Sequence, residues 1–138
     1  MKGYVNNTQL ADIYYNYDLR GIALHSRFGS DTGEGIINKA DGFGNIVQTD
    51  STMGGITRSL RYRYDQNNNR EQIVHVDNTM FMYEFDALNR MRIIREGTNP
   101  DMLNMSYNNA GRRSAIIRKY NNSTALARTD YQYNDAQR

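Results

Sequence analysis

The chain contains no cysteine, no tryptophan and one proline among its 138 residues. Without cysteine it has no disulfide bridges and no thiolate metal ligands, and the redox compartment stays open. No stretch approaches the roughly 18 consecutive apolar residues that a membrane-spanning helix needs, and the first residues, MKGYVNNTQLAD, lack the apolar segment of a secretory signal. A helical period is also missing over any useful length. The sequence therefore predicts neither a disulfide-stapled domain nor a helical membrane protein.

Aromatic residues and methionine supply much of the apolar bulk, with 11 Tyr, 4 Phe and 7 Met, while aliphatic residues are scarce. Hydrophobic residues make up 38% of the chain, and the mean hydropathy is −0.82. Tyrosine favours half-buried, pleated surfaces, so this composition predicts thin β structure with one apolar face rather than a thick core. The 17 basic and 15 acidic residues are well mixed, which gives no electrostatic footprint for nucleic acid.

A short phrase recurs along the whole chain, as in YNYDLRG from Tyr15, YRYDQNNNR from Tyr62 and YQYNDAQR from Tyr131. Each copy centres on an Asp or Asn that we call the anchor: Asp18, Asp41, Asp65, Asp86, Asn108 and Asn134. Aromatic residues stand one and three positions before most anchors, at Tyr15, Tyr17, Tyr62, Tyr64, Tyr83, Phe85, Tyr107, Tyr131 and Tyr133. The third position after the anchor holds Gly21, Gly44, Asn68, Asn89 or Gly111, and Gln137 departs from the pattern. Such recurrence predicts a repeat protein, a single array of six units at about residues 1–22, 23–45, 46–69, 70–90, 91–112 and 113–138.

The chemistry of the phrase predicts a β-hairpin. Aromatic residues two apart, such as Tyr83 and Phe85, lie on one face of a strand. An Asp or Asn at the first turn position accepts backbone hydrogen bonds and favours a type I turn. Gly or Asn three residues later supports the left-handed backbone of a bulge. We therefore expect an all-β fold of repeated antiparallel hairpins in one continuous, curled or spiralling strip, resembling a β-solenoid or a shell wall, with the aromatic ladder inside.

The same residues admit other chemical interpretations, which the spacing disfavours. Catalytic or calcium-binding carboxylates must converge, whereas turns along a strip hold the anchors apart. The acidic loop Ser30–Glu34 lacks EF-hand spacing, and neither His25 nor His75 has a second histidine or a cysteine nearby in sequence. We expect no catalytic residue, no metal and no cofactor. The tyrosines beside arginines could stack on sugars, but a packing ladder is the favoured interpretation.

The repeated phrase resembles the YDxxGR motif of the Rhs/YD-repeat family, and the resemblance covers the whole chain, for example in YNNAGRRSA from Tyr107. It assigns the motif arginines to Arg70, Arg90, Arg112 and Arg138. The resemblance implies a hairpin strip that spirals into a hollow shell. Bacterial relatives of this kind enclose a toxic domain, and a related barrel in teneurins serves cell adhesion. The family's shell-closing region, with its aspartic self-cleavage site, is missing here, and six hairpins are too few to enclose a cargo alone.

The two ends of the sequence are in phase with the repeat. Arg138 falls in the arginine position of the motif, and MKGYV resembles the residues that follow Arg90. Either the sequence is a segment of a longer Rhs chain, or copies pair head to tail through edge strands. We expect a non-enzymatic structural protein of a hollow or filamentous extracellular or cell-surface assembly. The alternatives are a segment of a polymorphic-toxin shell and an adhesion module that binds cell-surface glycans.

Overall fold

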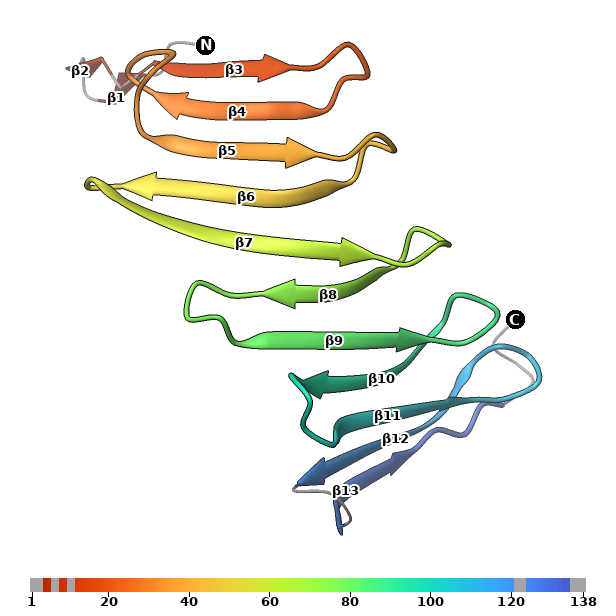
Figure 1. Ribbon diagram of the computed structural model, residues 1–138. Helices are drawn as coiled ribbons and strands as arrows, with labels where there is room; N and C mark the ends of the chain where they lie inside the picture. The colour runs from red at the N-terminus through yellow and green to blue at the C-terminus, as the bar shows by residue number, and fades with distance from the viewer. Residues whose placement is uncertain (1–3, 6–7, 10–11, 121–123, 135–138) are drawn as a thin grey trace. The chain divides into compact units, whose positions relative to one another are not determined.

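The fold is all-β in a computed structural model that describes residues 4–5, 8–9, 12–120 and 124–134 (Figure 1). The described residues form thirteen strands and no helix. The strands are β1 (Tyr4–Val5), β2 (Thr8–Gln9), β3 (Ile13–Tyr17), β4 (Ala23–Phe28), β5 (Gly35–Ala40), β6 (Ile46–Met53), β7 (Ile56–Tyr64), β8 (Arg70–Val74), β9 (Met80–Phe85), β10 (Met91–Glu96), β11 (Asp101–Tyr107), β12 (Arg113–Tyr120) and β13 (Thr124–Asp130).

Eleven of these strands, β3 to β13, follow one another in a single antiparallel meander. Each strand is hydrogen-bonded to its neighbours in sequence, and β3 and β13 are the two outermost strands. The short strands β1 and β2 pair only with each other. The prediction of repeated antiparallel hairpins is confirmed. Because β3 and β13 do not pair, the sheet is open rather than closed into a barrel.

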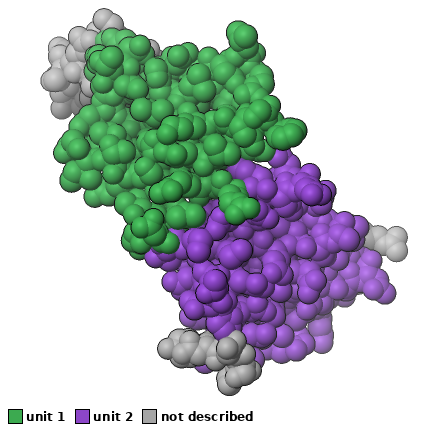
Figure 2. All heavy atoms as spheres, viewed as in Figure 1, with its two compact units in different colours: residues 1–63, 74–78 green, residues 64–73, 79–138 purple. Residues whose placement is uncertain are grey.

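The chain forms two compact units, which Figure 2 distinguishes by colour. Unit 1 contains residues 1–63 and 74–78, and unit 2 contains residues 64–73 and 79–138. Neither unit has a thick core. Among the side chains that the structure describes, Met105 and Ala115 are the only buried apolar ones, at 9% and 5% exposure. Most strand residues are half-buried, as expected for a sheet of tyrosine, methionine and isoleucine without a covering layer.

The hairpins anchored at Asp18, Asp41, Asp86 and Asn108 carry the same β-bulge. In the first hairpin Tyr17 pairs with Ala23, but Asn16 pairs with His25, so Leu24 has no residue opposite it. The extra residue is always the sixth after the anchor, and the others are Val47, Arg92 and Ser114. A bulge of this kind increases the local twist of the strands. The hairpins are therefore copies of one another in backbone as well as in sequence.

The register is also the same at four junctions between successive hairpins. The seventh residue after one anchor lies opposite the fourth residue before the next anchor, as in His25 with Ile37 and Ile93 with Asn104. The other two pairs at this position are Gln48 with Arg61 and Ala115 with Asp130. The loops that join the hairpins differ in length, from Gly54–Gly55 to residues 29–34. Variation in repeat length is thus taken up beyond this pair, by the loop together with the adjoining strand ends, as in the long strands β6 and β7 around the two-residue turn, and the register at the pair is kept.

Candidate functional site

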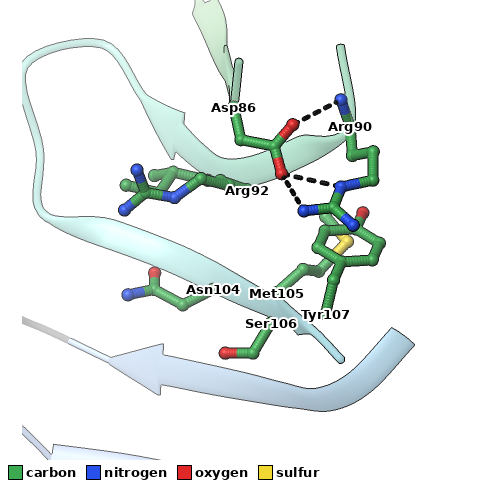
Figure 3. A pocket seen from close by; sticks show the side chains of 8 residues that line it. Asp86, Arg90, Arg92, Asn104, Met105, Ser106 and Tyr107 are labelled. Atoms are coloured by element: carbon green, nitrogen blue, oxygen red, sulfur yellow. Dashed lines mark hydrogen bonds and ion pairs between the residues drawn. The ribbon is translucent and has the colours of Figure 1, made fainter. Parts of the chain in front are cut away.

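The repeated anchored turn is the most regular polar structure in the chain, and Asp86 illustrates it (Figure 3). Its Oδ1 accepts hydrogen bonds from the backbone N–H groups of Leu88 and Arg90, at 2.9 and 3.0 Å. Its carbonyl oxygen accepts from the N–H of Asn89, and its own N–H donates to the carbonyl of Arg90, both at 2.9 Å. Asn89 has a φ of 59°, a left-handed conformation that Asn tolerates better than most residues. One side chain therefore satisfies both exposed donors of the turn.

The same pattern is present at the other anchors for which the turn is described. The anchor Oδ1 accepts from the second and fourth N–H groups at 2.8–3.0 Å in the turns of Asp18, Asp41, Asp65 and Asn108. The third position has positive φ at Gly21, Gly44, Asn68 and Gly111. Asn134 is exposed, while the rest of its predicted turn, including Gln137 and Arg138, lies outside the described residues. The predicted residues of each described turn therefore contact one another within that turn.

The second oxygen of each anchor carboxylate contacts a side chain of its own turn. Asp86 Oδ2 accepts from Arg90 Nε at 2.7 Å, and Asp65 Oδ2 accepts from Asn69 Nδ2 at 2.9 Å. Asn69 and Arg90 are both the fourth residue after their anchors, whereas Arg70 is the fifth and begins β8 as an exposed residue. The position that the motif gives to arginine is therefore filled by Asn69 in this repeat.

These hydrogen bonds lower the pKa of the four anchor carboxyls below its ordinary value. For Asp18 and Asp41 the largest cause is the backbone N–H of the fourth residue of the turn. The pKa of Asp65 and of Asp86 falls mainly because the side chain of that fourth residue, Asn69 or Arg90, donates to the carboxylate. The anchors are thus held ionised by turn formation, which is a structural role and not the raised pKa of a general acid.

A tyrosine directly before each of the last two anchors, Asn108 and Asn134, contacts the repeat before it. The Tyr107 hydroxyl donates to the carbonyl oxygen of Met91 at 2.7 Å, and the guanidinium of Arg90 lies 4.5 Å from the centre of the Tyr107 ring. Figure 3 shows this tyrosine beside Arg90. Tyr133 repeats both contacts one unit later, donating to Arg113 at 2.7 Å with Arg112 at 4.5 Å. At these two anchors the preceding tyrosine therefore connects one repeat to the next, and we call it a stapling tyrosine.

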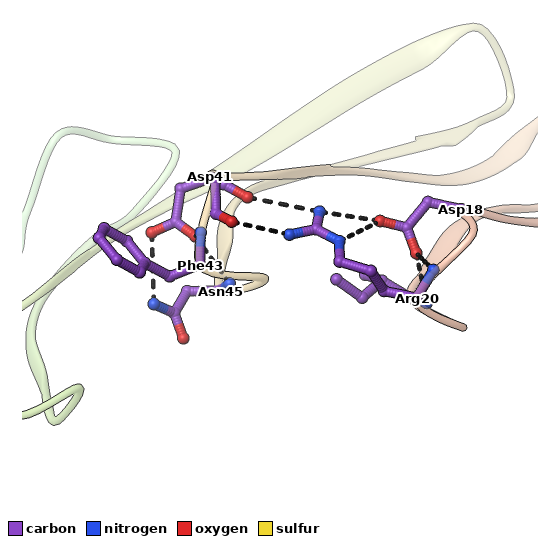
Figure 4. Close-up of polar contacts among 7 residues, drawn as sticks. Asp18, Arg20, Asp41, Phe43 and Asn45 are labelled. Atoms are coloured by element: carbon purple, nitrogen blue, oxygen red, sulfur yellow. Dashed lines mark hydrogen bonds and ion pairs between the residues drawn. The ribbon is translucent and has the colours of Figure 1, made fainter.

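Where this tyrosine is replaced, a different polar contact connects the turns. Ala40 stands before Asp41, and there Arg20 Nη1 of the preceding turn donates to the carbonyl of Gly42 at 2.9 Å, with a longer contact of 3.5 Å to the Asp41 carbonyl (Figure 4). Phe85 stands before Asp86, and there Asn69 Nδ2 donates to Asn89 Oδ1 at 2.9 Å. Adjacent turns are linked in each case, although the residues differ.

The predicted aromatic ladder divides into half-buried and exposed members. Half-buried positions are held by Tyr62, Tyr64, Tyr83, Phe85 and Tyr107. Tyr15 and Tyr17 on the outermost strand β3 are each 55% exposed, and Tyr131 and Tyr133 are each 38% exposed. In unit 2 the ladder continues through aliphatic residues, since Tyr83 lies opposite Ile94 and Ile94 lies opposite Leu103. Its packing partners are therefore the strand neighbours of the same face.

Sequence patterns did not predict the contact of Glu34. Its carboxylate accepts hydrogen bonds from the N–H groups of Gly54 and Gly55, at 2.9 and 2.6 Å, and the pKa of Glu34 falls, mainly because of the Gly55 N–H. These glycines form the two-residue turn between β6 and β7 with φ of 60° and 74°. A Gly-Gly pair is the available signal for that turn, but nothing in the spacing points to Glu34 as its partner.

The described residues contain no group of three or more His, Cys, Asp or Glu side chains arranged to hold a metal ion. His25 Nε2 lies 3.1 Å from the Asp31 carboxylate, while His75 is exposed next to the turn that ends at Asn78. The two histidines therefore sit in separate surroundings. Within the part of the chain that is described, no helix is long and apolar enough to cross a membrane.

No protein-family model matches the chain, and a search of curated proteins returns no significant match.

Proposed function

We propose that this chain is a non-enzymatic structural repeat protein that forms part of the wall of a larger hollow or filamentous assembly. The observation that carries the proposal is the constant register between successive hairpins, together with the contacts that link their turns. Such construction favours lengthening the sheet repeat by repeat. A shared strand register suits a wall, because each added hairpin then pairs with the preceding hairpin in the same way.

The thinness of the sheet supports the same proposal. Two buried apolar side chains among those described are few for a globule, and the apolar faces stay half-exposed. Further strands, or a layer packed on one face, would cover this surface in an assembly. The outermost strands β3 and β13 offer the backbone groups for that extension.

The Rhs/YD resemblance gives the proposal its detail. A curled strip with the aromatic residues inside, an extracellular or cell-surface location and a place within a longer shell-forming chain all follow from it. Head-to-tail pairing of separate copies is the other arrangement that would extend the wall. Both use the same junction between hairpins.

Light scattering after size-exclusion chromatography, combined with electron microscopy of the same fractions, tests the proposal. We expect species much larger than 16.0 kDa whose mass rises with concentration, and elongated or curved particles. Tyr15→Pro should reduce their mass because proline removes a strand-edge donor. The matched control is Leu19→Lys, which changes a fully exposed turn residue. A discrete 16.0 kDa monomer at every concentration would contradict assembly by the chain itself.

A further inference from the structure

Tyr17 occupies the same position as the two stapling tyrosines but lies on the outermost strand of the sheet. Tyr107 and Tyr133 each receive an arginine over the ring and donate to a carbonyl of the preceding return strand. Tyr17 likewise stands directly before its anchor, Asp18, yet 55% of it is exposed. Within the described residues, its side chain forms neither of the two contacts.

The backbone of β3 also has groups that point away from the sheet. The Asp12 carbonyl accepts from the N–H of Gly29, which places Asp12 on the side facing β4. Because backbone groups alternate along an antiparallel strand, those of Ile13 and Tyr15 point outward. The outward N–H of Tyr17 is already satisfied by Asn16 Oδ1 at 2.8 Å. Among the described residues no strand pairs with this side of β3, and its sequence IYYNY contains no charge and no proline that would discourage pairing.

The opposite edge is built differently. In β13, Arg128 and Asp130 form an ion pair at 2.8 Å, and both side chains are more than half exposed. Charged side chains on an edge strand discourage pairing with another chain. The contrast makes β3 the better suited of the two edges to accept a strand.

The constant register specifies how a strand would dock on β3. At the four well-described junctions, the seventh residue after an anchor lies opposite the fourth residue before the next one. On β3 that fourth residue is Tyr14, so the eighth residue of the docking strand lies opposite Ile13. The arginine four residues after the docking strand's anchor then covers the Tyr17 ring, and the following carbonyl accepts the Tyr17 hydroxyl. Two return strands of this chain follow an anchor with arginine at its fourth position, Arg90 or Arg112. Both have isoleucine, Ile94 or Ile116, as the eighth residue after the anchor.

We propose that the β3 edge is an acceptor site for a return strand of the type Asp/Asn-x-x-x-Arg supplied by another chain, with Tyr17 as its recognition residue. The inference rests on the proposed wall function and names the chemistry of the partner at one edge. The partner strand adds to the sheet by backbone pairing, and the arginine and the carbonyl give specificity for its register.

A peptide from the chain itself tests this proposal. A fluorescently labelled peptide with the sequence of residues 108–118, NNAGRRSAIIR, is titrated with the intact chain, diluted until light scattering reports monomer, and its anisotropy is measured. We expect saturable binding. Tyr17→Phe should weaken it about five- to tenfold, because one hydrogen bond is lost, and Tyr17→Ala should weaken it further because the ring is also lost. A peptide with alanine in place of its first arginine should bind the unaltered chain as weakly as the unaltered peptide binds the Tyr17→Ala chain.

Two controls locate the site. Leu126→Ala changes an exposed residue of β13 and should leave binding unchanged, while Tyr15→Pro should abolish it, with the fold of each variant checked by circular dichroism. Binding that is insensitive to Tyr17→Ala, or that is lost in Leu126→Ala, overturns the proposal, as does the absence of binding to the unaltered chain. Large particles without peptide binding would overturn the acceptor site while leaving the wall function standing. A monomer that binds the peptide but never assembles would support the acceptor site and contradict assembly of the wall by this chain.

Discussion

The hydroxyl of Tyr107 donates a hydrogen bond to the carbonyl oxygen of Met91 at 2.7 Å, across sixteen residues of sequence. The same ring lies under the guanidinium of Arg90, whose Nε also donates to Asp86. One tyrosine, one arginine and one aspartate thus connect two consecutive turns. The behaviour of each of these residues can be tested separately.

Tyr107→Phe should lower the free energy of unfolding by about 1 kcal/mol, because it removes one hydrogen bond and keeps the ring. Urea denaturation followed by circular dichroism would measure the change. The matched control is Tyr83→Phe, since among the described residues the Tyr83 hydroxyl forms no hydrogen bond, and Tyr83 lies opposite Ile94 in the sheet. Equal effects of the two substitutions would show that the inter-repeat hydrogen bond does not stabilise the sheet.

Asp86→Ala should lower the urea midpoint more than Asp86→Asn. Alanine leaves the N–H groups of Leu88 and Arg90 without their acceptor, whereas asparagine keeps the acceptor oxygen. The natural Asn108 demonstrates this, since its Oδ1 accepts from Ala110 and Arg112, both at 3.0 Å. Asparagine loses the ion pair with Arg90 and the hydrogen bond that Arg90 Nε donates to the second carboxylate oxygen. If the urea midpoints of both variants fell equally, the carboxylate charge and not the turn geometry would be the stabilising element.

Stability should fall in acid because the anchor carboxyls have lowered pKa values in the folded chain. A lowered folded-state pKa stabilises the fold above the unfolded-state pKa, near 3.8. That stabilisation is lost as the pH falls through the folded values, because protonation then favours the unfolded chain. Urea midpoints measured from pH 6 down to the acid range should decline below about pH 4.

The comparison variant for acid sensitivity is Asp86→Asn, which removes one of the four carboxyls. Its midpoint should depend less steeply on pH than that of the unaltered chain. A constant midpoint in the unaltered chain from pH 6 to the acid range would contradict the role of the anchor carboxylates.

Gly35→Ala should destabilise the fold by roughly 2 kcal/mol or more. Gly35 is buried with a φ of 149°, and a Cβ there would overlap the backbone carbonyl of Ser26 on β4. Gly42→Ala is the control, because a Cβ at Gly42 has no neighbour within 4 Å and its φ is not positive. Thermal unfolding should separate the two variants, and similar midpoints would mean that β4 and β5 can move apart without cost.

The hairpins were predictable because their determinants are local. Five residues from Asp86 to Arg90 contain the acceptor, the left-handed asparagine and the partner of the second carboxylate oxygen. The sequence of the repeated phrase therefore indicates all three determinants together. In the Asp65 turn the fourth residue is Asn69, which hydrogen-bonds the anchor, and the predicted motif arginine, Arg70, is the fifth.

Contacts between hairpins could not be predicted in the same way. Arg20 reaches the Gly42 carbonyl, and Glu34 reaches the Gly54 and Gly55 N–H groups, over about twenty residues. These pairings depend on the strand register, which the unequal loop lengths hide in the sequence. The register becomes visible only when residues are numbered from each anchor.

The hairpin ends opposite the anchored turns, where loop and strand lengths vary, have a consequence for how such chains can change. A residue gained in the turn at Gly54 and Gly55 alters neither the bulge at Val47 nor the pairing of Gln48 with Arg61. A residue gained inside an anchored turn would break the hydrogen bonds of its aspartate. Insertions, accessory segments and engineered tags are therefore accommodated at one end of each hairpin, while the other end conserves the geometry by which one hairpin recognises the next.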